Sequence, residues 1–301
     1  MNRRRTNSKG ARALRAQFRR LLSNDPKDAL ARMKHNGKII LNSDDLFQIL
    51  PEYGTDPKQR PLLGPLLYSV AKEFIDRMYR KLLSRPVRRD NIVVFTAGGS
   101  ATGKSTILRI AGAKPGVDFV VDTTFSDTRR AFLQVDRALA SHRKVEIHYV
   151  YADFRKSVRW MIRRALDPDS GRLVPIDDMA RTHFGAQRSI LAALQKYQAN
   201  KKIVIYLREN AGPSSLSMLK EAEFERRLHD SIDGLRRLGQ SVLDELCKGR
   251  GGKRSHGRKN QNARGKGLQI SDAIYQAARS KTQGAKSPSR KSNARRLAKG
   301  A

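Results

Sequence analysis

The sequence predicts an α/β fold in which a parallel sheet carries helices on both faces, and two observations support this prediction. From Asn91 onward, short apolar runs alternate with segments of helical periodicity, a pattern typical of parallel sheets covered by helices. The first apolar run leads into a glycine-rich motif and then a helix, the order found in phosphate-binding loops. We expect three parts: a basic helical region of residues 1–90, an α/β domain of residues 91–247 and a basic tail of residues 248–301.

Helical periodicity dominates the region before residue 91. Residues 11–34 predict a basic amphipathic helix, and a second helix is expected to begin near Ser43 and end at Pro51. A longer helix is expected from about residue 65 to residue 83, because apolar residues recur there every four positions: Leu66, Val70, Phe74, Met78 and Leu82.

The α/β domain alternates strands with helices. We expect strands over residues 91–97, 117–123, 145–152 and 202–207. We expect helices over residues 104–112, 126–141, 154–166, 177–199 and about 217–247.

The net charge of +34 is concentrated at the two ends of the chain. Residues 248–301 hold 16 Lys and Arg but one acidic residue. So basic a segment buries too little apolar surface to offset its ordering entropy, so we expect a largely disordered tail with at most a short helix over residues 268–278. Such a tail predicts salt-sensitive, non-specific binding of nucleic acid, with a merely solubilising role as the alternative.

Cysteine content and hydropathy predict a cytoplasmic protein without membrane contact. Cys247 is the only cysteine, so an intramolecular disulfide is excluded and a reducing compartment is expected. The chain has no apolar run long enough to cross a bilayer.

The pattern G-x-x-x-x-G-K-[ST] at residues 98–105 predicts a nucleoside triphosphate site. Glycines allow the tight turn that aims backbone N–H groups at phosphates, at the positive end of the following helix. We expect Lys104 to reach the β- and γ-phosphates and Ser105 to hold Mg²⁺. The residues expected to bind ATP or GTP are Gly98, Gly99, Ser100, Ala101, Thr102, Gly103, Lys104, Ser105 and Thr106.

Asp122 is a candidate catalytic group because it ends the apolar run of residues 117–121. Ligands of parallel sheets bind beyond the carboxyl ends of the strands, which places Asp122 near the glycine-rich loop. A carboxylate there can hold Mg²⁺, accept the proton of an attacking hydroxyl or bind a substrate hydroxyl.

Arginines after the third strand supply cations for phosphoryl transfer. Arg163 and Arg164 end one expected helix, and Arg172 lies in a loop that resembles a lid. A lid arginine can close over the phosphates and exclude water. We expect His183, on the helix after this loop, to be a packing or surface residue.

The order of these features resembles the zeta toxin family of P-loop kinases, over roughly residues 90–212. The resemblance rests on the glycine-rich loop, on Phe119 to Thr124, on the segment from Arg163 to Pro175, and on Arg208 to Gly212. It implies a P-loop kinase-like sheet and an ATP- or GTP-dependent transfer to UDP-activated amino sugars. By resemblance, Arg164 or Arg163 and Arg172 act on the transferred phosphate, and Asn210 lies near the nucleotide base.

One element of the family is missing from its usual place. Zeta toxins have a further strand between the P-loop helix and the strand that corresponds to residues 117–122, and its end carries the catalytic aspartate. Here Gly112 to Gly116 lead directly into Val117. Asp122 matches a later, substrate-binding acidic position, which leaves open whether Asp122 also serves as base or whether the base is lost.

The sequence therefore favours a kinase that transfers the γ-phosphoryl group of ATP or GTP to a hydroxyl of a small molecule or UDP-sugar, with Mg²⁺ held by Ser105 and Asp122. The basic ends keep a polynucleotide 5′-hydroxyl kinase as one alternative. The missing strand leaves a second alternative, which is a nucleic-acid-binding protein that binds nucleotide without turnover. The resemblance also raises an antitoxin-like protein as a partner.

Overall fold

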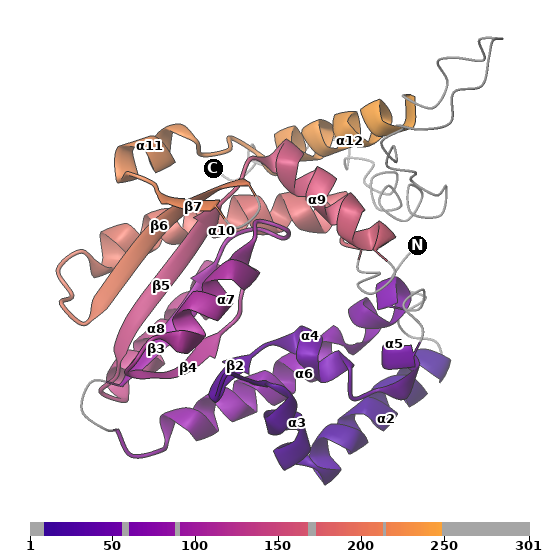
Figure 1. Ribbon diagram of the computed structural model, residues 1–301, viewed down its shortest axis with the longest axis vertical. Helices are drawn as coiled ribbons and strands as arrows, with labels where there is room; N and C mark the ends of the chain where they lie inside the picture. Colours follow the sequence, from indigo (N-terminus) through magenta and orange to yellow (C-terminus); the bar gives the residue numbers. More distant parts are fainter. Residues whose placement is uncertain (1–8, 56–59, 88–90, 168–172, 213–214, 249–301) are drawn as a thin grey trace, which may run out of the picture.

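A computed structural model describes residues 9–55, 60–87, 91–167, 173–212 and 215–248. Within these ranges the strands form one seven-stranded sheet in the order β1-β2-β4-β3-β5-β6-β7 (Figure 1). The strands are β1 (Lys34–His35), β2 (Lys38–Leu41), β3 (Ile92–Ala97), β4 (Val117–Val121), β5 (Lys144–Tyr151), β6 (Ile203–Gly212) and β7 (Ser215–Met218).

The five inner strands run parallel, and the short edge strands β1 and β7 are antiparallel to their neighbours. Strand β3 lies at the centre, where Val94 pairs with Val120 of β4 on one side and with Glu146 of β5 on the other. The carboxyl ends of all five parallel strands consequently meet at one edge of the sheet, which is where ligands bind in such folds.

Helices cover both faces of the sheet, as the sequence predicts. On one face α7 (Lys104–Ala113) packs through Ile107 against Val94 and Val120. On the other face lie α6 (Arg60–Leu83), α8 (Thr128–Ala140) and α10 (Ile176–Tyr197), whose apolar side chains share a core with the sheet (Figure 1). The described residues therefore have a mostly parallel α/β fold with helices on both faces of the sheet.

The remaining helices extend this core at its two ends. The N-terminal group consists of α2 (Lys9–Asn24), α3 (Pro26–Arg32), α4 (Ser43–Phe47) and α5 (Pro51–Thr55). It packs on α6 around the rings of Phe18, Phe47 and Tyr53. A second core joins α10 to α9 (Phe154–Leu166) and α12 (Ile232–Lys248), while α11 (Glu221–Arg226) follows β7.

Two strands stand where the sequence analysis expects only helices. The two-residue turn at Asn36 and Gly37 has φ values of 49° and 77°, which suits a tight β-hairpin and makes Asn-Gly a strong hairpin signal. After the turn, β2 pairs in parallel with β4, with Ile39 opposite Phe119. The four-residue apolar run of β2 is too short to show a strand pattern by itself. Residues 1–90 are therefore not only helical, because part of them belongs to the sheet.

Two expected helices are each divided. The helix expected over residues 11–34 is interrupted at Asp25, whose side chain caps α3 while Pro26 begins it; proline suits a helix start because it has no backbone N–H to leave unpaired there. The helix expected over residues 217–247 is divided into α11 and α12, and its first two residues belong instead to the unexpected strand β7. No helix in the described part of the chain is long and apolar enough to span a bilayer. The predicted tail disorder and the helix expected over residues 268–278 lie outside the described residues.

Arg143 joins the end of α6 to the sheet. Its side chain is fully buried, and its Nε donates to Oδ2 of Asp118 at 2.9 Å. Its other nitrogens donate to the backbone carbonyls of Leu82, Leu83 and Arg85 at 2.9 to 3.1 Å. A cation is favourable at a helix C-terminus because the last carbonyls lack partners there. This contact ties the C-terminal end of α6 to β4 through Asp118.

Replacement of Arg143 by Leu is expected to lower the free energy of unfolding by about 3–5 kcal/mol, because it leaves a carboxylate and three carbonyls without their donor. Urea denaturation followed by circular dichroism measures the change. The control is Arg129→Leu, which removes an exposed arginine of α8 and should cost less than about 0.5 kcal/mol. Equal effects of the two substitutions would contradict the structural role of Arg143.

Candidate nucleotide-binding site

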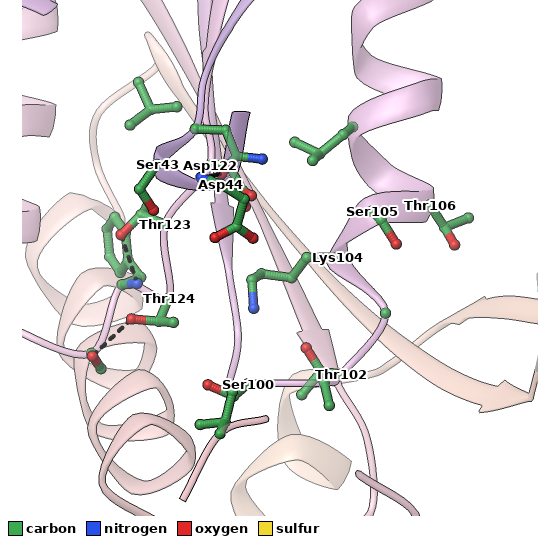
Figure 2. A pocket seen from close by; sticks show the side chains of 18 of the residues that line it. Ser43, Asp44, Ser100, Thr102, Lys104, Ser105, Thr106, Asp122, Thr123 and Thr124 are labelled. Carbon is green, nitrogen blue, oxygen red and sulfur yellow. Dashed lines mark hydrogen bonds between the residues drawn. The ribbon is translucent and has the colours of Figure 1, made fainter. Parts of the chain in front are cut away.

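A cavity of about 600 Å³ lies at the carboxyl ends of the parallel strands. Three segments that follow strands line it: residues 100–106 after β3, residues 121–127 after β4 and residues 42–44 after β2. Side chains of α6, α8 and α9 complete its wall. Figure 2 shows Lys104, Asp122 and Asp44 pointing into this cavity.

The loop of residues 98–103 requires glycine at both ends. Gly98 has a φ of 133° and Gly103 a φ of 91°, values that other residues rarely adopt. A Cβ at Gly98 would lie 2.5 Å from the carbonyl oxygen of Val150, and one at Gly103 would overlap the side-chain amide of Asn210. The sequence motif thus reflects backbone geometry as well as close packing against two neighbouring strands.

His183 supports the middle of the loop. A Cβ at Gly99 would overlap the His183 ring, whose Nε2 lies 2.9 Å from the carbonyl oxygen of Ser100. Because that carbonyl can only accept, Nε2 carries the proton. Burial lowers the pKa of His183 to about 3, so the ring is neutral at physiological pH. The structure therefore gives His183 a packing role, as the sequence analysis expects, and places it directly under the phosphate loop.

Lys104 follows the loop at the start of α7 and turns back toward it. Its Nζ donates to the carbonyls of Gly98 at 3.0 Å and Gly99 at 2.7 Å. Burial lowers the pKa of Lys104 to about 8, while the carboxylate of Asp122 acts in the opposite direction. A cation that has lost part of its hydration in this way gains from an anionic ligand.

Asp122 directly follows β4, and its carboxylate is held by the neighbouring strand. Thr96, buried in β3, donates its hydroxyl to Oδ1 of Asp122 at 2.8 Å. Burial raises the pKa of Asp122, while Lys104 and the bond from Thr96 oppose that rise and the charge of Asp45 adds to it. The carboxylate is oriented for a metal ion or a proton next to the loop.

The structure separates the three candidate arginines. Arg164 lines the cavity, and its Nε is buried without a hydrogen-bond partner among the described residues. Arg163, one position earlier on α9, is exposed and does not line the cavity. Arg172 lies outside the described residues. A buried guanidinium nitrogen without a partner is costly unless a ligand supplies an acceptor, which makes Arg164 the arginine that fits a phosphate.

Asn210 lies at the end of β6, where it is buried against the loop. Its Nδ2 donates to the carbonyl oxygen of Thr102 at 2.9 Å, and its Oδ1 accepts from the N–H of Gly212 at 3.2 Å. The residue also lines the cavity. The contact with Thr102 shows that Asn210 positions the loop, whereas its place near a nucleotide base stays a prediction from the resemblance.

The sequence analysis missed the contribution of the segment after β2. Asn42, Ser43 and Asp44 line the cavity, although the sequence indicates only the start of a helix there. The expected helix start is confirmed, because α4 begins at Ser43 and Oδ1 of Asn42 caps it by accepting from the N–H of Asp44 at 2.8 Å. The Asn-Gly turn and the apolar run that precede these residues are the signals that could have placed them at the sheet edge.

The residues present fit a nucleoside triphosphate with Mg²⁺. The glycine-lined loop, Lys104 and the unpartnered Nε of Arg164 suit a chain of phosphates. Ser105 and Asp122 are oxygen donors of the kind that Mg²⁺ prefers. The described residues contain no group of three or more His, Cys, Asp or Glu that would bind a metal alone, and Mg²⁺ in kinases takes its remaining ligands from phosphates and water.

The neutral state of His183 predicts a pH-dependent stability. With a folded-state pKa of about 3 and an unfolded value near 6.5, the unfolded chain binds the proton first as the pH falls. The free energy of unfolding should therefore decrease below about pH 6.5, by up to about 1.4 kcal/mol per pH unit from this group. Urea denaturation between pH 4 and pH 8 measures the slope.

His183→Gln should flatten that slope while still donating an N–H to Ser100. The control is His142→Asn, which removes an exposed histidine with a positive φ of 61° that asparagine tolerates. An unchanged slope in His183→Gln would contradict the buried, neutral state of this histidine.

Comparisons with known proteins give one family match, which covers the part of the chain that follows the glycine-rich loop. Residues 111–215 match the model of the zeta toxin family. A solved structure from the PezAT chromosomal toxin–antitoxin system of the human pathogen Streptococcus pneumoniae is similar at 12% identity, over 59% of this chain and 96% of that one, with a TM-score of 0.33. A search of curated proteins finds no match. The match over residues 111–215 shows that this part of the chain resembles the zeta toxin family.

Proposed function

We propose that this protein is a kinase that transfers the γ-phosphoryl group of ATP or GTP to a hydroxyl of a small molecule or UDP-sugar. The observation that carries the proposal is the meeting of three charged groups from different elements at one cavity. Lys104, Asp122 and Arg164 line it together with the phosphate loop. A cation, a carboxylate and an arginine around a glycine-rich loop are the groups that phosphoryl transfer needs.

The loop and its neighbours hold the phosphates. We expect unpaired backbone N–H groups at the N-terminus of α7 to bind the triphosphate, and Lys104 to neutralise charge on its terminal groups. Arg164 contributes a guanidinium to the equatorial oxygens of the transferred group. Ser105 and Asp122 would hold Mg²⁺, which neutralises charge on the β- and γ-phosphates. Arg172, which the sequence analysis expects to close over the phosphates, lies outside the described residues.

The cavity extends beyond the loop and offers room for an acceptor. Tyr68 and Lys72 of α6 and Gln134 of α8 also line it. A volume of about 600 Å³ lies within the usual range of small-molecule sites, about 300–1,000 Å³. This size supports a small acceptor. Because the chain resembles zeta toxins, UDP-activated amino sugars are the first acceptors to test. An antitoxin-like protein is the proposed partner, and the cytoplasm is the proposed compartment.

Loss of Lys104 is expected to abolish transfer. Lys104→Met should lower the rate by at least about 100-fold, because a cation on the terminal phosphates is removed. The assay incubates the full chain with γ-labelled ATP or GTP, Mg²⁺ and a panel of UDP-sugars, nucleosides and 5′-hydroxyl oligonucleotides. The control is Lys156→Met, which removes an exposed lysine of α9 and should leave the rate unchanged.

The same panel distinguishes the alternatives. Label on an oligonucleotide alone would identify a polynucleotide kinase. Tight binding of a fluorescent ATP analogue without transfer to any acceptor would contradict the kinase proposal and favour a protein that binds nucleotide without turnover.

A further inference from the structure

We propose that Asp44, which precedes the phosphate loop in the sequence, is the general base that accepts the proton of the acceptor hydroxyl. This inference rests on the proposed kinase function and assigns its acceptor side. Asp44 lines the same cavity as Lys104 and Asp122 (Figure 2). It lies outside residues 111–215, which match the zeta toxin model.

Strand pairing brings Asp44 to the reaction edge. Leu41, the last residue of β2, pairs with Val121, the last residue of β4. The N–H of Asp122 donates to the carbonyl oxygen of Leu41 at 3.1 Å, which continues the ladder past both strand ends. Two carboxylates, Asp122 and Asp44, therefore follow adjacent parallel strands at the same edge of the sheet.

Local packing fixes the segment that carries Asp44. Asn42 caps α4 through the N–H of Asp44, and the next turn buries Leu46 and Phe47 in the main core. Lys38 holds the start of β2 by donating from Nζ to the carbonyl oxygen of Val117 at 2.8 Å. The backbone at Asp44 is consequently anchored on both sides, as positioning of a catalytic group requires.

The neighbouring carboxylate, Asp45, has a different environment. Its Oδ2 lies 2.8 Å from Nε2 of His35 in the β1–β2 hairpin. It is not among the residues that line the cavity. The segment thus presents one of its two adjacent carboxylates to the cavity, and that carboxylate is Asp44.

The positions of the two cavity carboxylates suggest a division of roles. Asp122 follows the strand beside β3, and its carboxylate is bonded to Thr96 of β3, so it belongs to the phosphate and Mg²⁺ side. Asp44 follows β2, one strand further from the loop. Helix α6 packs against β2 and α4 and lines the cavity with Tyr68 and Lys72, so the acceptor is placed beside Asp44.

With Asp44 as the base, the proton, the bonds and the leaving group of the transfer are all accounted for. The acceptor O–H bond breaks, its proton passes to the carboxylate of Asp44, and the oxygen forms a bond to the γ-phosphorus. The bond from the γ-phosphorus to the β,γ-bridging oxygen breaks, and its electron pair leaves with the nucleoside diphosphate. Asp44 then releases its proton to solvent. A base at this position contributes when it lies within hydrogen-bond reach of the acceptor hydroxyl.

The test compares Asp44→Asn with the unmodified full chain in the labelled-ATP assay, using the acceptor that the panel identifies. The nearly isosteric amide cannot take up the proton, so kcat should fall by about 10²- to 10⁴-fold. The Kd of a fluorescent ATP analogue should stay within about twofold, because the phosphate loop is untouched. Asp44→Glu restores a carboxylate and should recover part of the rate. Glu52→Gln, an equal charge change at an exposed site of α5, is the control and should keep the full rate.

The outcomes separate this inference from the proposed function. Full transfer by Asp44→Asn together with loss of transfer in Asp122→Asn would overturn the assignment of Asp44 and leave the kinase function standing. A parallel loss of folded structure and ATP binding in both Asp44→Asn and Asp44→Glu would also overturn it, in favour of a structural role. An unmodified chain that transfers to no acceptor would overturn the proposed function and this inference with it.

Discussion

The parallel pairing of β2, β4 and β3 is the constraint on which the candidate site depends. The register sets Leu41 beside Val121 and Phe95 beside Val121 from the other side, so three loops leave the sheet at one edge. Each loop supplies a different group to the cavity, although the three are far apart in the sequence. A one-residue shift in such a ladder would turn every side chain of the strand to the opposite face, and it would also move the carboxylates that follow the strands.

Buried polar groups at this edge are balanced against one another. Lys104 donates to two carbonyl oxygens of the loop, while Asp122 is held by Thr96. Burial disfavours the charge of both, and their mutual attraction opposes that effect. Arg164 adds a second cation with a buried nitrogen that lacks a partner in the described structure. Such an arrangement is stabilised when a polyanion enters, which couples ligand binding to the stability of the site.

The sequence predicted the α/β part closely because periodicity is strong there. The helix expected over residues 154–166 is α9, and the strand expected over residues 91–97 is β3. The phosphate loop was equally predictable, because its glycines are required by φ values and by close packing. Prediction failed at β2, since a four-residue strand obtains its stability from pairing with β4 and from the core, neither of which local periodicity records.

Site residues could be predicted where they follow a recognisable strand or motif, and not where tertiary contacts place them. Asp122 follows a recognisable strand, so the rule about strand ends located it. The position of Asp44 at the cavity depends on β2, a strand that periodicity does not reveal. Arg163 and Arg164 differ because the rotation of α9 places the first in solvent and the second at the cavity. The support of the loop by His183 comes from a tertiary contact that spans 83 positions of the sequence and leaves no local pattern.

The β1–β2 hairpin has a consequence for the order in which the protein can fold during synthesis. Ile39 leaves the ribosome well before Phe119, its partner in β4, and pairing across such a separation is slow because loop closure precedes any gain from contact. Until β4 appears, one side of β2 is an unpaired edge, which is a hazard for association between nascent chains. The hairpin is short, and its lysines at positions 34 and 38 are charges of the kind that protect such edges.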